Sequence, residues 1–182
     1  MTEQIPQQPL EVLLRMQRES LAAGRVMPEQ RQAEPLWSGL AFSVGEIRVV
    51  TELTSVTDVV ECPKITPVPR AKTWLRGIAN VRGSLYSIVD LALFLGYEQQ
   101  TSETEGRLLV LNAGELGCAL LVPRIFGIRH FNEEQESQVI SVLDRGVQPY
   151  AEQAFLHEGE LWAVLDVQRL VEADAFRQVV VG

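Results

Sequence analysis

The chain has 182 residues and a formal net charge of -8, with 46% hydrophobic and 22% charged residues. This composition predicts a globular protein long enough for one domain, or for two small subdomains around a shared core. The acidic balance argues against binding to nucleic acid or to an anionic membrane surface, since both need a clustered basic face. No apolar run approaches the ~20 residues that a membrane-spanning helix needs, so direct membrane insertion is not expected.

Residues 1–35 are predicted to form an amphipathic helix followed by a polar linker. Four leucines fall near one face of residues 9–23, with Pro9 suited to the first helical turn and Gly24 to the stop. The helix either packs these leucines onto the domain or docks a partner, and the sequence leaves both interpretations open. The first ten residues are polar and include Glu3, unlike a secretory signal, so a cytoplasmic location is expected.

From residue 36 onward the pattern changes to short strands with hairpin spacing. Strands are predicted at residues 40–44, 47–50, 56–60, 107–112, 116–122, 125–131, 150–156 and 161–165. The proline-rich stretch 62–69 reads as an extended connector, residues 71–75 as one helical turn, and residues 167–173 as the last helix. Many short strands and few helices predict a mainly β fold of small barrels over residues 36–175, with residues 176–182 as a tail.

Residues 74–91 carry the most informative pattern of the chain. An apolar run ends at the turn Asn80-Val81-Arg82-Gly83, and a short apolar strand then leads to Asp90 before an apolar helix. Residues 83–91 align with residues 159–167, with glycine, leucine, an aromatic residue and aspartate in register. Each copy reads as a strand that runs into a short helix, which predicts two similar subdomains.

The 74–91 segment resembles the signature of CheW-like domains, the adaptors that couple chemoreceptors to histidine kinases. Val81 stands where the family usually has leucine and Ser87 where it usually has proline, and both changes keep the shape of the motif. The resemblance implies two five-stranded SH3-like barrels that share an apolar core. The extension ahead of the domain is similar to the PilI-type branch of the family, which serves twitching motility by type IV pili.

The resemblance also implies partners and a location. It implies a non-enzymatic adaptor that binds the cytoplasmic tip of a methyl-accepting chemoreceptor, in a groove between the barrels, and the regulatory domain of a two-component histidine kinase. Such an adaptor is recruited from the cytoplasm to receptor clusters at the inner membrane. An alternative within the family is an inhibitory or competing regulator, which would bind the kinase without the receptor.

Candidate interface residues surround the signature turn. Asn80 suits the positive φ of a turn, and Gly83 permits the turn to be tight. A buried Arg82 would need an ionic partner, and by the resemblance Asp58 faces it. Arg82 is therefore interpreted either as a paired core arginine or as a receptor-contact residue. Four apolar residues are candidates for contact and equally for ordinary core: Val56, Val59, Ile78 and Val81.

The sequence offers no catalytic, cofactor-binding or metal-binding pattern. Asp90 and Asp166 each precede an apolar helix, so they are interpreted as helix caps. A small enzyme that used them as paired carboxylates would need the two within about 10 Å of each other. The two histidines and two cysteines have no metal-ligand spacing, and the cysteines are expected to be buried free thiols.

Overall fold

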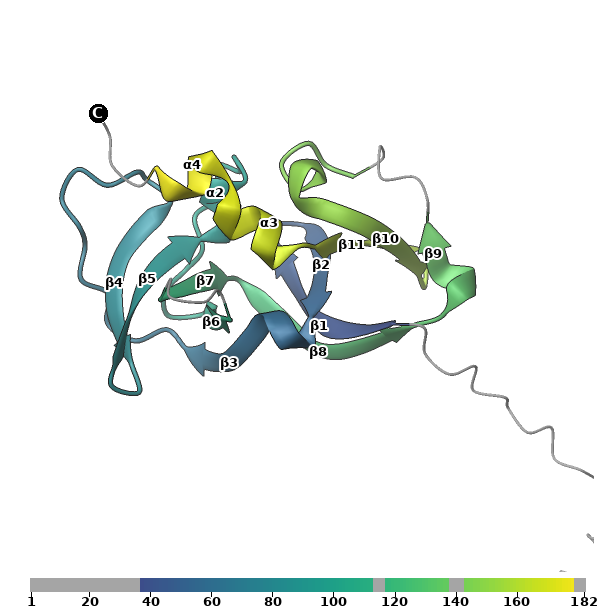
Figure 1. Cartoon of the computed structure of the whole chain (residues 1–182), viewed down its shortest axis with the longest axis horizontal. Coiled ribbons are helices and arrows are strands. Elements are labelled where there is room, and N and C mark those ends of the chain that lie inside the picture. The colour runs from purple at the N-terminus through teal and green to yellow at the C-terminus, as the bar shows by residue number, and fades with distance from the viewer. Residues whose placement is uncertain (1–36, 113–116, 138–142, 179–182) are drawn as a thin grey trace, which may run out of the picture. The chain divides into compact units, whose positions relative to one another are not determined.

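The structure is a computed structural model that describes residues 37–112, 117–137 and 143–178. These residues belong to one compact unit, Pro35–Gly182, built from two antiparallel-rich β-sheets and three short α-helices (Figure 1). The amphipathic helix predicted at residues 9–23 lies outside the described residues. No helix in the described part of the chain is both long enough and apolar enough to cross a membrane.

The first sheet contains the strands from the beginning and from the end of the described chain. In spatial order its strands are β8 (Arg124–Phe131), β1 (Trp37–Val44), β2 (Ile47–Glu52), β11 (Glu160–Leu165), β10 (Ala151–His157) and β9 (Glu136–Ser137). Neighbouring strands are antiparallel except β11 and β2, which run parallel. The sixth strand, β9, is only two residues long, so the sheet is the expected five-stranded unit with one short addition.

The second sheet contains the middle of the chain. Its order is β3 (Val56–Glu61), β6 (Arg107–Leu111), β7 (Cys118–Val122), β5 (Ser84–Asp90) and β4 (Leu75–Val81). Here β5 and β7 form the parallel pair. The second sheet thus repeats the plan of the first. In each sheet an edge strand lies beside one hairpin, and a parallel strand pair joins that hairpin to a second hairpin. The chain crosses between the sheets twice, from β2 to β3 and from β7 to β8.

The internal sequence repeat corresponds to the two equivalent hairpins. The first copy forms β5 and the helix α2 (Leu91–Phe94), and the second forms β11 and the helix α3 (Val167–Glu172). In each hairpin the two turn residues have positive φ, with 52° and 92° at Arg82-Gly83 and 52° and 80° at Glu158-Gly159. Positive φ at both central residues defines the type I′ turn, whose twist matches that of the flanking strands.

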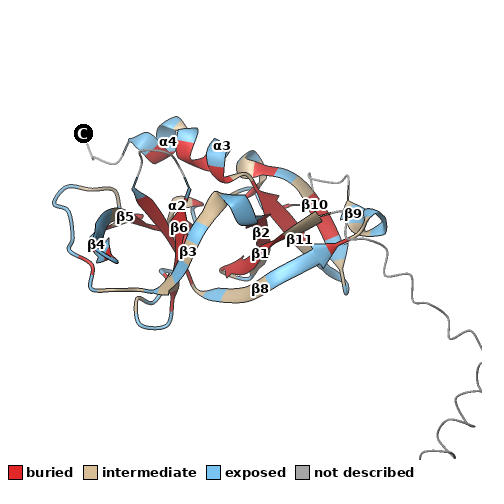
Figure 2. Ribbon diagram, turned by 60° about the horizontal axis from the view of Figure 1, so that its bottom comes forward, coloured by how far each residue is buried: buried red, intermediate tan, exposed pale blue. Residues whose placement is uncertain are grey.

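Apolar side chains of the described residues pack in three clusters, one between the two sheets and one enclosed by each sheet. Alternation along the strands decides which cluster a residue joins, because successive side chains point to opposite faces. On β6, for example, Leu108 and Val110 join the cluster inside the second sheet, whereas Leu109 and Leu111 join the central cluster. A third cluster around Phe155 fills the first sheet. Buried residues lie on the strands of both sheets and on one side of α3 (Figure 2). The mainly β fold of two barrels around a shared apolar core is confirmed.

The C-terminal end of the fold differs from expectation. A further helix, α4 (Asp174–Arg177), follows α3 and brings Phe176 into the central cluster. Its ring stacks on Trp74 at 5.9 Å between centroids and meets Phe94 edge-on at 5.1 Å. The prediction of a tail from residue 176 is wrong for this residue. A single aromatic residue in a polar stretch carries no periodic signal, so its burial was not visible in the sequence.

Two local predictions in the middle of the chain have opposite outcomes. The 62–69 connector is extended, and Thr66 exchanges backbone hydrogen bonds with Ile78 of β4. The helical turn predicted at residues 71–75 is wrong. That stretch makes a β-turn in which the Leu75 N–H donates to the Lys72 carbonyl, and it leads directly into β4.

Replacing Phe176 with alanine should lower the free energy of unfolding by about 3 kcal/mol, because truncating a buried aromatic side chain loses its burial and leaves a cavity. Urea denaturation followed by circular dichroism measures the change. The adjacent exposed Arg177→Ala is the matched control and should stay within about 0.5 kcal/mol of the natural protein. Equal stability of the two variants would show that α4 does not contribute to the core.

Candidate functional site

The signature turn is the tip of the β4–β5 hairpin. Arg82 and Gly83 are its two central residues, and the side-chain oxygen of Asn80 accepts a hydrogen bond from the Gly83 N–H at 2.9 Å. The positive φ expected at Asn80 falls instead on Arg82, because Asn80 is still inside β4. The prediction for Asn80 is therefore wrong for the backbone, although its side chain does satisfy a local backbone group. Gly83 adopts φ of 92°, which favours glycine.

Arg82 forms an ion pair with Asp58, with 2.9 Å between Nη1 and Oδ2. The Arg82 side chain is 75% exposed, so the interpretation as a core arginine is wrong. An ion pair this exposed contributes about 0–1 kcal/mol, so its main effect is to orient the guanidinium group. Asp58 lies on β3 and Arg82 follows β4, the two edge strands of the second sheet. The pair therefore links the two edges of that sheet.

The four apolar candidates separate into core and surface. Val81 is buried inside the second barrel, and Val56 packs partly against the central cluster. Val59 and Ile78 remain about 40% exposed. Strand alternation explains the division on β4, where Ile78 and Val81 point to opposite faces.

A further exposed apolar residue, Leu85, was missed by the sequence interpretation. Leu85 is 69% exposed and lies directly opposite Asn80 across the hairpin, so both share one face with Ile78. We call Ile78, Asn80 and Leu85 the hairpin face. Alternation along β5 could have identified Leu85, because the neighbouring Ile88 and Tyr86 occupy the inner face.

The buried cation of the signature is Arg76, not Arg82. Its side chain is 15% exposed and pairs with Asp90, at 3.6 Å, and with Glu103. Asp90 is fully buried and also accepts hydrogen bonds from the Thr101 N–H at 2.8 Å and the Thr101 hydroxyl at 3.1 Å. This network attaches the loop that contains Thr101 to the end of β5. Sequence reasoning missed it because Arg76 lies in an apolar run without a nearby acid in the sequence.

The two aspartates lie at helix N-termini on different sheets. Asp90 accepts hydrogen bonds from the Ala92 and Leu93 N–H groups of α2, and Asp166 accepts one from the Arg169 N–H of α3. With its oxygens occupied and no exposed surface, Asp90 cannot act on a substrate. The acid beside Asp166 is Glu152, whose pKa is raised by burial and by the Asp166 charge.

The cysteines are free thiols, with Cys118 buried and Cys62 partly exposed. Burial raises the pKa of the Cys118 thiol to about 12, and burial followed by the Glu103 charge raises the pKa of Cys62. Within the described residues, no three histidine, cysteine or acidic side chains gather as metal ligands would.

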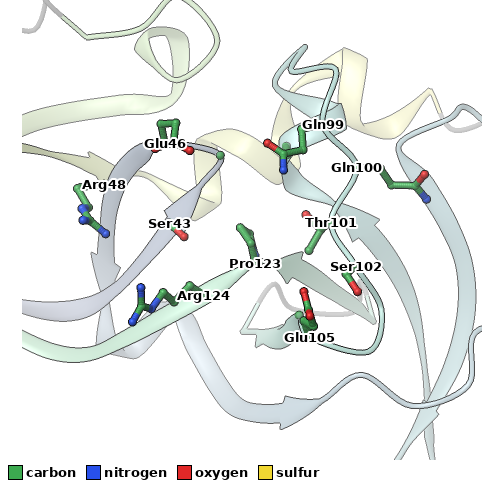
Figure 3. A pocket seen from close by; sticks show the side chains of 13 residues that line it. Ser43, Glu46, Arg48, Gln99, Gln100, Thr101, Ser102, Glu105, Pro123 and Arg124 are labelled. Atoms are coloured by element: carbon green, nitrogen blue, oxygen red, sulfur yellow. The ribbon is translucent and has the colours of Figure 1, made fainter.

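Two hollows lie where the chain passes from β7 to β8. The smaller, of about 270 Å³, lies between Val59 on β3, Arg107 on β6 and Ile125 on β8, and so joins the two sheets. The larger, of about 430 Å³, is lined by residues of β1, β2 and the 99–106 loop (Figure 3). Both hollows include Pro123 and Arg124, so this crossover lines each of them.

Comparison with known proteins decides the family. The model of the CheW-like domain matches residues 38–175. The chain belongs to the CheW-like domain family. It is 35% identical over 161 residues to the protein PilI of Pseudomonas aeruginosa, covering 88% of this chain and 89% of that protein. It is 25% identical over 135 residues to the chemotaxis protein CheW of Thermotoga maritima, covering 73% and 86%.

The fold agrees with that assignment. The crystal structure of the scaffolding protein TtCheW from Thermoanaerobacter tengcongensis matches with a TM-score of 0.64 at 18% identity, over 76% of this chain and 94% of that one. The CheW-like region includes the signature turn that carries Arg82, which we call the arginine turn, as well as the hairpin face and both hollows. The chain is thus a CheW-like scaffold domain of the chemotaxis type.

Replacing Asp90 with alanine should lower the free energy of unfolding by about 3–5 kcal/mol, because it leaves a mostly buried Arg76 without its partner. The same change at Asp166 removes one exposed cap and should cost only about 1 kcal/mol. Chemical denaturation of both variants measures the difference. Similar losses would mean that Asp90 acts as a cap alone.

Thiol reactivity should follow exposure. At about pH 8, a disulfide reagent should modify Cys62 in the folded protein and Cys118 only after unfolding, because a buried thiol with a raised pKa provides almost no accessible thiolate. Spectroscopic titration of free thiols, repeated with Cys62→Ser, assigns each phase. Rapid modification of folded Cys62→Ser would contradict the burial of Cys118.

Proposed function

We propose that this chain is a non-enzymatic adaptor that couples the cytoplasmic tip of a methyl-accepting chemoreceptor to the regulatory domain of a two-component histidine kinase. The observation that carries the proposal is the arginine turn, where an exposed Arg82 is oriented by Asp58 rather than buried. An exposed and oriented arginine beside apolar surface is typical of protein-binding sites. The apolar surface here is the hairpin face, with Ile78 and Leu85.

The receptor tip binds in the smaller hollow between the two barrels. Val59 of β3 lines this hollow and Asp58 of the same strand holds Arg82, so the hollow and the arginine turn share the edge strand β3. The kinase regulatory domain binds elsewhere on one barrel, which leaves the receptor surface free. Signal transfer requires that the adaptor bind the receptor states with different affinities, since equal affinity would shift no equilibrium.

The behaviour controlled is twitching motility by type IV pili. The similarity to PilI, at 35% identity over most of both chains, supports this branch above the others in the family. In this role the adaptor works in the cytoplasm and is recruited to receptor clusters at the inner membrane. Its contacts are modest in area, about 1,000 Å² or less, as suits an array that rearranges during signalling.

Replacing Arg82 with alanine should weaken receptor binding about tenfold and leave kinase binding within about twofold, because the truncation removes one interface arginine while the exposed ion pair contributes little to folding. Binding of the purified full chain to a receptor cytoplasmic fragment and to a kinase regulatory domain from the same genome measures both affinities. The exposed Arg145→Ala is the matched control.

Three results would contradict the proposal. Binding to neither partner by a folded natural chain would exclude the coupling role. Binding to the kinase domain alone would indicate the competing regulator instead. Equal loss of both affinities in Arg82→Ala, together with a lower melting temperature, would make Arg82 a structural residue.

A further inference from the structure

Three side chains form a row across the end of the first sheet. Ser43 on β1 lies directly opposite Arg48 on β2 and directly opposite Arg124 on β8. Side chains directly opposite each other share a face of the sheet, so the serine lies between two arginines. All three line the larger hollow, and Figure 3 shows both guanidinium groups on the same side of it as Ser43.

A shared aromatic ring holds the two arginines in place. The Arg48 guanidinium carbon lies 4.4 Å from the centre of the Phe126 ring, and that of Arg124 lies 5.4 Å from it. Arg48 also lies 5.9 Å from the Trp162 ring. Stacking on aromatic rings holds a guanidinium group in position while leaving its N–H edge free to donate.

Within the described part of the chain, acidic side chains balance the positive charges of these two arginines only in part. Arg124 has no acidic partner there, and Arg48 has one exposed pair, at 3.1 Å, with the half-exposed Glu160. Ser43, which lines the larger hollow, is 7% exposed as a residue, and its hydroxyl makes no hydrogen bond to another described residue. Two neighbouring cations repel each other, so an anion between them would relieve that repulsion, and the Ser43 hydroxyl could donate a hydrogen bond to it.

We infer that Ser43, Arg48 and Arg124 form a clamp for a carboxylate side chain of the receptor segment that docks between the barrels. This inference rests on the proposed function and names the chemistry that the receptor must present. Planar, forked donors suit a carboxylate, and the serine hydroxyl adds a third donor. The chain has a net charge of -8, so a clamp with two arginines is a locally positive site on an acidic protein. Such a site favours an acidic partner.

The lining of the hollow favours a polypeptide over a small anion. Glu46 and Glu105 line the same space, so the hollow as a whole is not strongly cationic. A free phosphate would meet these acids, whereas a polypeptide can place one carboxylate at the clamp and donors or cations opposite the glutamates. Arg124 also lines the smaller hollow with Val59, so a receptor segment there lies next to the clamp.

The test is charge reversal at the clamp. Arg124→Glu in the full chain should weaken binding to the receptor fragment at least tenfold, leave the kinase affinity within about twofold, and reduce the salt dependence of receptor binding. Arg129→Glu, five residues along the same strand and exposed, is the matched control and should change receptor affinity no more than twofold. Arg124→Gln removes the charge without adding one and should weaken binding by a smaller factor.

A charge swap identifies the receptor residue. Single substitution of each acidic residue of the receptor fragment by arginine should produce one variant that restores binding to Arg124→Glu. If Arg124→Glu and Arg48→Ala bind the receptor normally while Arg82→Ala does not, the clamp is wrong and the coupling role stands. If Arg124→Glu loses kinase affinity instead, the clamp serves the other partner and the inference is wrong. If the natural chain binds no receptor, the proposed function itself fails.

Discussion

The fully buried carboxylate of Asp90 imposes a constraint on the surrounding structure. A desolvated charge must be paired and hydrogen-bonded, and here Arg76, Thr101 and the first turn of α2 meet that requirement. These partners belong to β4, to the loop before β6 and to the helix that follows β5. Satisfying one charge therefore fixes where three segments of the second barrel meet, and the loop held in this way lines the larger hollow.

The two barrels are built alike but carry different surfaces. Both have a type I′ hairpin, a parallel strand pair and a short helix, as expected from the internal repeat. In the second barrel the hairpin turn presents Arg82, paired across the sheet edges with Asp58. The equivalent turn of the first barrel presents Glu158, next to His157. A repeated scaffold with unequal turns suits the proposed role, in which the adaptor binds two different partners.

The crossovers between the sheets place the candidate binding surfaces. Because β3 and β8 each follow a hairpin of the opposite sheet, both edge strands start at the junction of the barrels. Val59 and Arg124 thereby line one hollow although 65 positions separate them in the chain. An exposed strand edge invites unwanted pairing. On β4 the connector covers part of that edge through the two Thr66–Ile78 hydrogen bonds.

The sequence by itself determined most of the strands, the hairpin turns, the repeat and the family, because alternation and turn chemistry are local properties of the chain. It also indicated Asp58 as the partner of Arg82, through the resemblance. Only the tertiary structure decided that Arg82 is exposed and Arg76 is the buried cation, since both have apolar neighbours in the sequence. Likewise, the positions of Phe176, Leu85 and the Ser43–Arg48–Arg124 row depend on strand register and on which faces meet. Burial and register depend on contacts between distant residues, and a local pattern does not contain them.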